Sequence, residues 1–508
     1  MSKPSRRPTR EAIKQQRKEK KQAEKQLRER QMDQDLTPSM HTTTPNRRCS
    51  YETVAEEKQA RQEAVSEQAR VFRSRLPILL NRLSRIPDPR DPQKLKHKLT
   101  LLMIYGILTF VFQMASRRQA NRKMTRPMFM ENLKLVFPEL ENLPHHDTLM
   151  RLLSEIDVGQ IERTHIELVK QLIRKKKFQR YLINGCYPIA MDGSQKLVRD
   201  WLWAEECLER EVKDGDKTKT QYYVYVLEAA LAFSDGMTIP LMSEFLSYTQ
   251  GDTEAIKQDC EIKAFYRLAK RLKKEFPCLR IMVMLDGLYA KGPVMEVCRK
   301  NKWQFIIVLK DNCLKSVWEE FEGLKKLQIQ NRYQMNWGHR KQSFQWVVDI
   351  EYCYGSNDRQ RQTVHVVVCE ENWQEVAKGS SEIIEKTARH AWISNTPLDK
   401  SNIHELCNLG ARHRWGIESE FLVEKRHGYQ YEHNFSYNWN AMKGYHYLMR
   451  LGHMLNILAH YSERLIVMVK EMGIRGFIQF VCETISGPWL DAALIKQSLA
   501  APFQLRLA

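Results

Sequence analysis

The stretches Tyr187–Ser194 (YPIAMDGS) and Ile281–Gly287 (IMVMLDG) decide the fold class of this 508-residue chain. Each is a short apolar run that ends in Asp followed by Gly, so each predicts a buried strand that ends at a carboxylate, Asp192 or Asp286. Open α/β sheets bind ligands beyond the carboxyl ends of their strands, which makes both aspartates candidate functional residues. Taken alone, either Asp-Gly pair is also typical of an ordinary turn after a strand.

The sequence around these two strands predicts a mixed α/β sheet. Residues 222–236 and 237–247 are typical of two strands joined by a short turn. A long amphipathic helix, residues 253–277, leads into the strand at 281–285, and another helix precedes a strand at 305–310. Strands and helices in this order place the chain in the α/β class.

Helical and strand-rich segments flank this sheet. Residues 94–180 have helical apolar spacing and end in the basic run Arg174–Lys177, which indicates a helical domain with either a DNA-facing edge or simply a basic surface. Residues 331–394 are strand-rich, and helical spacing returns between Ser401 and Tyr429. The expected parts are, in order, a basic, Gln-rich arm that is helical or disordered (1–70), a helical, DNA-binding domain (71–180), the first part of the core (181–310), a β-rich insertion (311–395), a helix that completes the core (396–450) and a C-terminal helical region (451–508).

Charge and composition limit the classes of function. The chain has 81 Lys and Arg against 61 Asp and Glu, a net charge of +20, and residues 1–30 alone hold 12 basic and 4 acidic residues. An excess of this size favours a polyanionic partner. The 11 cysteines form no CxxC pair, which argues against a disulfide framework or a zinc site of Cys pairs and indicates reduced thiols in a cytoplasmic protein. The apolar run Leu99–Ala115 contains Thr100, Thr109 and Gln113 and predicts a buried helix rather than a membrane span.

A third carboxylate, Glu418, ends the segment Ala411–Glu418 (ARHRWGIE). Arg414, Glu418 and Lys425 are separated by four and seven residues, so a helix would place all three on one face. An acid between two bases on one face suits a site that binds metal and phosphate, but an exposed i,i+4 salt bridge explains Arg414 and Glu418 equally well. Glu420, two residues further on, points elsewhere on such a helix and is the second candidate for the acid.

The Arg-(3)-Glu-(6)-Lys spacing, with Trp after the Arg and Ile before the Glu, resembles the signature of a large bacterial insertion-sequence family of DDE transposases. In that family the signature reads Tyr-(2)-Arg-(3)-Glu-(6)-Lys. Arg414, Glu418 and Lys425 match it, whereas Ala411 stands at the Tyr position and leaves the role of that Tyr unfilled. The resemblance covers about residues 185–450.

This resemblance implies a fold and a chemistry. The fold is a ribonuclease H-like mixed-sheet catalytic core with a β-rich insertion before the helix that bears Glu418. The chemistry is cleavage of transposon ends and strand transfer to target DNA with two Mg²⁺ ions, which Mn²⁺ can replace. The family's first two acids follow apolar strands, as Asp192 and Asp286 do: Asp192 would bridge the two ions, and Asp286 and Glu418 would hold one each. Arg414 and Lys425 would bind phosphates near the cut.

The resemblance also implies partners. These are double-stranded DNA, as terminal inverted repeats and as target, and a second copy of the chain, because two ends must be cut and joined together. The implied location is the bacterial cytoplasm at the nucleoid, without a membrane. Members of the family often stack a flipped base on an aromatic side chain, and Trp337, Trp346 and Trp373 are either such residues or ordinary core aromatics. Two other functions stay open: a transposase-derived DNA-binding protein without catalysis, and a nuclease on the same core that lacks strand transfer.

Overall fold

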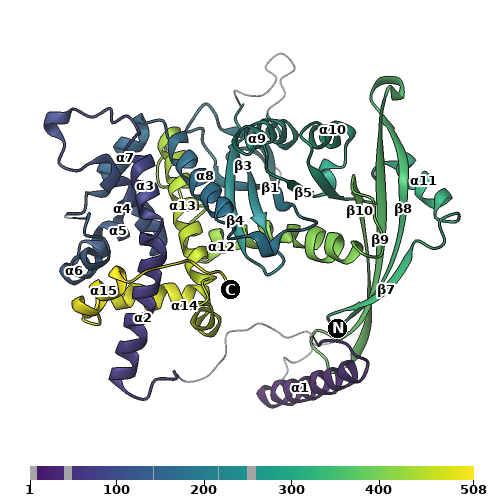
Figure 1. The fold of residues 1–508 in the computed structure, drawn as a ribbon, viewed down its shortest axis with the longest axis horizontal. Helices are drawn as coiled ribbons and strands as arrows, with labels where there is room; N and C mark the ends of the chain where they lie inside the picture. The colour runs from purple at the N-terminus through teal and green to yellow at the C-terminus, as the bar shows by residue number, and fades with distance from the viewer. Residues whose placement is uncertain (1–8, 39–48, 141, 216, 249–258) are drawn as a thin grey trace. The chain divides into compact units, whose positions relative to one another are not determined.

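The computed structural model of the chain describes residues 9–38, 49–140, 142–215, 217–248 and 259–508 (Figure 1). The chain divides into two compact units, which are described separately. Unit 1 consists of residues 1–43 and 285–411, and unit 2 consists of residues 44–284 and 412–508. Parts of the predicted arm, at 1–8 and 39–48, and the start of the predicted helix, at 253–258, lie outside the described residues.

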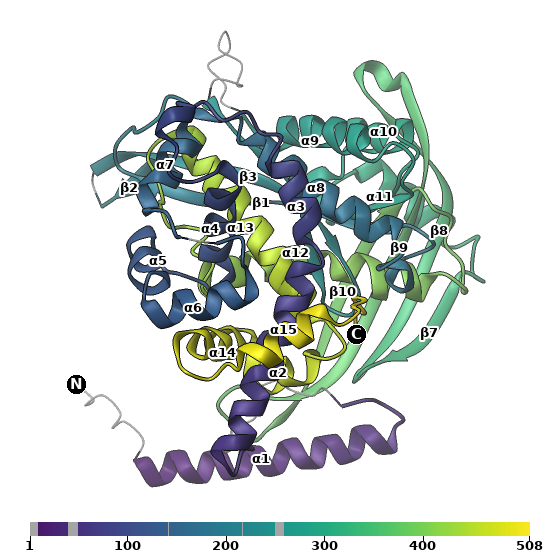
Figure 2. The same cartoon turned by 60° about the vertical axis from the view of Figure 1, so that its left-hand side comes forward.

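Unit 2 contains a helical layer built around α13 (Trp439–His460), which is almost entirely buried and contacts α2, α4, α7 and α8 (Figure 2). The predicted buried helix is confirmed as α4 (Leu99–Val111). Apolar residues occupy every side of α4 because other helices pack around it. Among the described residues, no helix is long and apolar enough to cross a membrane. Further helices of unit 2 are α2 (Val54–Arg73), α3 (Leu76–Leu83), α5 (Arg117–Met124), α6 (Pro127–Val136), α7 (His146–Glu155), α8 (Gly159–Arg174), α9 (Glu261–Glu275), α12 (Trp415–Arg426), α14 (Ile466–Ser486) and α15 (Ala492–Ala500).

The charged, Gln-rich sequence of α2 is packed into unit 2. Ala64 and Val65 are at most 2% exposed. Arg61 is buried as well, and its guanidinium donates hydrogen bonds to Glu57 at 2.8 Å and to Thr484 on α14 at 3.0 Å. Buried charges are tolerated when they are paired in this way, so composition alone underestimates how much of α2 is core.

Gly452 lies where α13 closely approaches α4. A Cβ atom built on Gly452 would lie 2.9 Å from the carbonyl oxygen of Ile107 and 3.1 Å from Cβ of Phe110, so a side chain does not fit. We expect Gly452→Leu to lower the free energy of unfolding by about 3 kcal/mol, because overpacking pushes the two helices apart. Gly476→Leu on α14 is the control, since a Cβ there would meet only Met472, at 3.4 Å. Urea unfolding compares the two variants with the wild type, and equal losses would contradict the prediction.

The last turn of α13 buries a histidine against an aromatic ring. His460 is 4% exposed, and its ring meets that of Phe477 edge-on at 5.6 Å. Burial lowers the pKa of His460 from 6.5 to about 3. Between these two values the unfolded chain binds the additional proton, so stability falls as the pH falls from about 6.5 towards 3.

We therefore expect His460→Leu to reduce the acid sensitivity of the fold. When the pH falls from 7 to 5, the wild type is expected to lose about 2 kcal/mol more of its free energy of unfolding than the variant. The difference arises because each pH unit below the pKa of the unfolded histidine costs about 1.4 kcal/mol. Urea unfolding at the two pH values measures this. Parallel losses in the variant and the wild type would show that His460 does not contribute.

The strands of unit 2 lie in the order β2-β3-β1-β5, with β4 also paired to β3. β1 runs antiparallel to β3 and parallel to β5, so the sheet is mixed, as predicted. α9 packs against β3 and β4. The strands are β1 (Tyr187–Arg199), β2 (Leu208–Asp214), β3 (Lys217–Ala232), β4 (Thr238–Phe245) and β5 (Ile281–Leu285), and the last residue of β5 begins unit 1.

The prediction that β1 ends at Asp192 is wrong. β1 continues to Arg199, and its ladder with β3, which begins at the pair Ile189 and Leu231, goes on past Asp192 and Glu228 to the pair Arg199 and Tyr222. The apolar run stops at Met191 because the next residues, Asp192 to Lys196, are polar or glycine even where they are buried, whereas the backbone pairing goes on. β2 was missed for a related reason, since its sequence, LEREVKD, is mostly charged.

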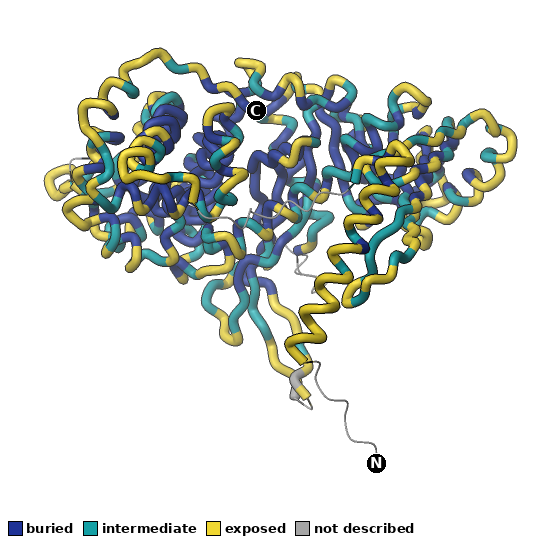
Figure 3. Tube along the Cα trace, turned by 90° about the horizontal axis from the view of Figure 1, so that it is seen from below, coloured by how far each residue is buried: buried dark blue, intermediate teal, exposed yellow. Residues whose placement is uncertain are grey.

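Unit 1 contains strands in the order β6-β10-β9-β8-β7. The strand-rich character of residues 331–394 is confirmed, and β10 pairs antiparallel with both β6 and β9, so the inserted strands and β6 form one sheet. α10 and α11 contact β8. α1 contacts β9 and buries Ala23, Leu27 and Gln31, while most of its other residues are exposed (Figure 3). The elements are α1 (Arg10–Asp33), α10 (Gly292–Lys300), β6 (Gln304–Val308), α11 (Lys315–Leu324), β7 (Arg332–Trp337), β8 (Arg340–Tyr354), β9 (Gln360–Val376) and β10 (Ile383–Ser394).

The three tryptophans of the inserted strands differ in exposure. Trp346 is 3% exposed and belongs to the core of unit 1, so it offers no surface on which a base could stack. Trp337 and Trp373 are half-buried, and the guanidinium of Arg340 lies 4.1 Å from the centre of the Trp373 ring. A role of Trp337 or Trp373 in stacking a base stays a prediction.

Candidate functional site

Asp192 lies within β1, on a sheet position that is largely shielded from solvent. Its side chain is 22% exposed, and Oδ1 accepts a hydrogen bond from the amide of Gly193 at 2.9 Å. Burial, together with the nearby charges of Glu418 and Glu261, raises the pKa of Asp192 to about 6, although Arg414 acts in the opposite direction. The negative charge of Asp192 is therefore only partly compensated by the protein.

Gly193 is required by close packing, and the alternative of a turn after Asp192 is excluded. The residue lies in β1, where a Cβ atom would come within 2.4 Å of the ring of Tyr225 and 2.8 Å of Oε2 of Glu261. Glycine lets the Tyr225 ring and the first residue of α9 approach the backbone beside Asp192.

Arg414 joins Asp192 to Glu418. The residue immediately precedes α12 and is 5% exposed, and its Nη2 donates a hydrogen bond to Oε1 of Glu418 at 2.8 Å. Its Nη1 lies 3.5 Å from Oδ2 of Asp192 on β1. The contact between Arg414 and Glu418 is the one that their spacing predicts for a helix, and the Glu418 side chain remains 37% exposed. One buried guanidinium thus holds together two carboxylates from different elements.

Lys425 forms an ion pair with an acid beyond the end of α12. Its Nζ lies 3.1 Å from Oε1 of Glu432, in the segment after α12, and 5.7 Å from the centre of the Tyr431 ring. Its side chain is 23% exposed. The described contacts of Lys425 therefore lie at the C-terminal end of α12, whereas Arg414 lies at the N-terminal end of the same helix.

Asp286 belongs to unit 1, whereas Asp192 and Glu418 belong to unit 2. The parallel register of β1 and β5 pairs Ala190 with Met284. Asp192 comes two residues after Ala190, and Asp286 comes two residues after Met284. Oδ1 of Asp286 accepts a hydrogen bond from the amide of Leu288 at 2.8 Å and so begins a short 3-10 turn. Nζ of Lys310 lies 3.9 Å from Oδ2 of Asp286.

Glu261 is a carboxylate of this region that sequence reasoning missed. It is the first residue of α9, and its Oε2 accepts a hydrogen bond from the hydroxyl of Tyr225 at 3.2 Å. An acidic residue in the first turn of a helix is common, so the sequence carries no signal that separates Glu261 from an ordinary helix start. Only the folded arrangement places its charge near Asp192.

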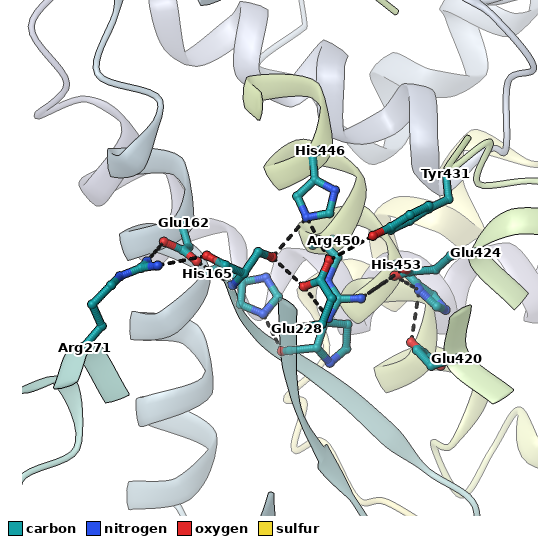
Figure 4. Close-up of polar contacts among 12 residues, drawn as sticks. Glu162, His165, Glu228, Arg271, Glu420, Glu424, Tyr431, His446, Arg450 and His453 are labelled. Carbon is teal, nitrogen blue, oxygen red and sulfur yellow. Dashed lines mark hydrogen bonds and ion pairs between the residues drawn. The ribbon is translucent and has the colours of Figure 1, made fainter. Parts of the chain in front are cut away.

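Glu420 does not lie beside Asp192 and Arg414 but points into the interior of unit 2. It is 7% exposed, and its Oε1 lies 3.1 Å from Nδ1 of His453 on α13 (Figure 4). Burial raises the pKa of Glu420 to about 7. Its direction into the core confirms the expectation that Glu420 and Glu418 occupy different faces of the helix.

The cluster of Asp192, Arg414 and Glu418 has the donors that a divalent cation needs. Carboxylate oxygens are the ligands that Mg²⁺ and Mn²⁺ prefer. The two carboxylates approach a single guanidinium, and the raised pKa of Asp192 shows that further positive charge would be favourable there. The residues present therefore fit a hard divalent cation.

Residues 80–169 match the family model described as DDE_Tnp_1-associated. The matched stretch runs from within α3 to α8, so it covers helices of unit 2 and none of the strands. No curated protein sequence matches the chain. The family match indicates a transposase-related protein.

Proposed function

We propose that this transposase-related chain is a DDE transposase, a metal-dependent enzyme that binds the ends of its own DNA element, cleaves them and transfers the strands to target DNA. The observation that carries the proposal is the cluster in which Asp192 of β1 and Glu418 of α12 share the guanidinium of Arg414. A protein that only bound DNA would gain nothing from two adjacent carboxylates, because carboxylates repel phosphate.

The proposed core is ribonuclease H-like. In support, three antiparallel strands, β1, β3 and β4, are followed by α9 and by β5, which is parallel to β1. This agrees with the mixed sheet that the resemblance implies. The strands inserted before α12 agree with the implied β-rich insertion.

Asp192, Asp286 and Glu418 would hold two Mg²⁺ ions in the active enzyme. Such a pair of ions activates the attacking water or 3′-hydroxyl and stabilises the departing oxygen of the phosphodiester. Asp192 and Glu418 are held in place by Arg414, which partly compensates their charges within the protein. Asp286, which directly follows β5, would supply the third carboxylate.

Two cations at the ends of α12 would bind the DNA. Arg414 offers a planar fork that suits a phosphate, and Lys425 offers a single point charge at the other end of the helix. The net charge of +20 supports a polyanionic partner for the chain as a whole. Two copies of the chain would act together, because both ends of the element must be cut and joined.

Incubation of the full-length protein with linear DNA that carries the ends of its own element tests the proposal. With Mg²⁺, end-labelled DNA is expected to be cut at the ends, and the released ends are expected to join a target plasmid. The same reaction with EDTA should leave the DNA uncut. Cutting without joining would indicate a nuclease on the same core, and binding without cutting in either Mg²⁺ or Mn²⁺ would indicate a DNA-binding protein.

A further inference from the structure

A second set of charges is buried in unit 2, on the inner side of α12 (Figure 4). Glu420 and Glu424 are four residues apart and therefore lie on one face of the helix. Glu424 is fully buried and Glu420 is 7% exposed, whereas the Glu418 side chain is 37% exposed. Thus α12 directs one acid to the candidate site and two acids into the core.

The sheet has a buried acid directly beside Asp192. In the antiparallel register of β1 and β3, Asp192 is paired with Glu228, and directly opposed residues project from the same face of a sheet. Glu228 is fully buried. α12 packs against both strands, so the face that carries Asp192 and Glu228 is the one that meets this helix and α13.

Arg450 of α13 joins Glu424 on α12 to Glu228 on β3. Its Nη1 donates hydrogen bonds to both oxygens of Glu424, at 2.9 and 3.0 Å, and its Nη2 lies 3.5 Å from Oε2 of Glu228. Arg414 makes the equivalent connection between Asp192 and Glu418. Two arginines thus connect neighbouring strands to the same helix: Arg414 connects β1 to α12 at the candidate site, and Arg450 connects β3 to α12 inside the core.

The remaining partners of Glu228 complete the network. Oε2 accepts a hydrogen bond from Ser243 at 2.6 Å, and Oε1 lies 3.2 Å from Nε2 of His446 and accepts a hydrogen bond from Tyr431 at 3.3 Å. Burial alone would raise the pKa of Glu228, but Arg450 and His446 outweigh it and lower the pKa to about 2. Glu228 is therefore charged and fully paired.

A metal ion is not the occupant that this network favours. Carboxylate and imidazole ligand atoms of Glu420, Glu424 and His453 lie within 4.8 Å of one another, which is a spacing that a cation could use. However, the guanidinium of Arg450 already binds both oxygens of Glu424, so the cation of this network is an arginine.

Buried ion pairs of this kind add little stability, because apolar residues of similar volume often serve as well. They do impose geometry, since a guanidinium fork binds a carboxylate in few directions. We propose that Arg450 is a positioning residue for the reaction: by joining Glu228, beside Asp192, to Glu424 on α12, it fixes where Glu418 lies relative to Asp192. This inference rests on the function proposed for Asp192 and Glu418.

Arg450→Lys and Arg450→Gln in the full-length chain test this inference. Arg450→Lys keeps the positive charge but loses the planar guanidinium, so it is expected to fold even if Arg450→Gln does not. Arg61→Gln is the matched control, because Arg61 is also a buried arginine paired with a glutamate, and its described hydrogen bonds go to Glu57, Thr484 and Phe480, outside α12 and the sheet. The readouts are amide hydrogen exchange of residues 415–426, the rate of Mg²⁺-dependent DNA cleavage at saturating DNA, and the affinity for DNA.

We expect both Arg450 variants to exchange the amides of α12 at least about tenfold faster, and to cleave DNA about 10- to 100-fold more slowly at unchanged DNA affinity. The reason is that displacement of a reacting group by about 1 Å costs on the order of 100-fold in rate. Arg61→Gln is expected to lower stability and to change neither α12 exchange nor the cleavage rate of the folded protein.

Wild-type exchange or a wild-type cleavage rate in Arg450→Lys would overturn the inference, and so would equal changes in Arg61→Gln. If the wild type itself cuts no DNA, the proposed function fails. Amide hydrogen exchange of α12 then tests by itself whether Arg450 anchors this helix. Unchanged exchange in the Arg450 variants would overturn the anchoring of α12, and faster exchange in these variants only would support it.

Discussion

Glu418→Gln is expected to lower metal-dependent DNA cleavage by at least about 10³-fold while the protein still folds and binds DNA. Gln has nearly the shape of Glu, and its amide oxygen can still accept the hydrogen bond that Arg414 donates at 2.8 Å. It lacks the negative charge that a divalent cation requires from its ligand. The measurement is the single-turnover rate of cleavage of end-labelled DNA in Mg²⁺, together with DNA affinity by gel shift.

Two further substitutions make this result specific to Glu418. Glu319→Gln changes the same charge on an exposed face of α11 and is expected to cut like the wild type. Glu420→Gln is expected to retain most of the activity, because Glu420 points towards His453 in the core. Normal cutting by Glu418→Gln combined with loss of cutting by Glu420→Gln would show that the wrong acid of α12 has been assigned.

Contacts within one helix or one strand are the part of the fold and site that the sequence predicts well. The four-residue spacing of Arg414 and Glu418 predicts a side-chain contact, which the structure shows. The apolar runs at 187–191 and 281–285 predict the strands that the structure forms there. Both signals are local, because helix and strand periodicity depend only on nearby residues.

Contacts between elements leave no such local signal. Asp192 and Arg414 are 222 residues apart, and no spacing predicts that they meet. Only the resemblance to a transposase family suggested one site for Asp192 and Glu418. The end of β1 was misplaced for the same reason, since its residues after Asp192 are held by pairing with β3 rather than by their own apolar pattern.

The buried network was missed because charged residues are usually at the surface. Its signals are present in the sequence as charges within apolar runs: Glu228 stands in LEAALA on β3, and Arg450 stands in YLMRLGHML on α13. A charge in such a run must find a partner when it is buried. Which partner it finds depends on how α12 and α13 pack, and that cannot be read from either run.

Arg414→Gln is expected to cost both stability and cleavage. Arg414 is 5% exposed and its guanidinium holds two carboxylates, so its removal leaves Asp192 and Glu418 as close, uncompensated charges. Breaking a buried ion pair costs about 3–5 kcal/mol, and the partial exposure of both acids reduces the expected loss to about 2 kcal/mol. The measurement is urea unfolding without divalent cations, with Arg426→Gln, an exposed arginine at the end of α12, as the control.

The same variant separates a structural role of Arg414 from the proposed metal site. If Asp192 and Glu418 are metal ligands, Mg²⁺ supplies the positive charge that Arg414→Gln removes, so Mg²⁺ should raise the melting temperature of the variant more than that of the wild type. Cleavage should nevertheless stay low, because the fork that would bind phosphate is missing. An Mg²⁺ response equal to that of the wild type would argue against a cation between these two carboxylates, and wild-type cleavage by the variant would remove Arg414 from the site.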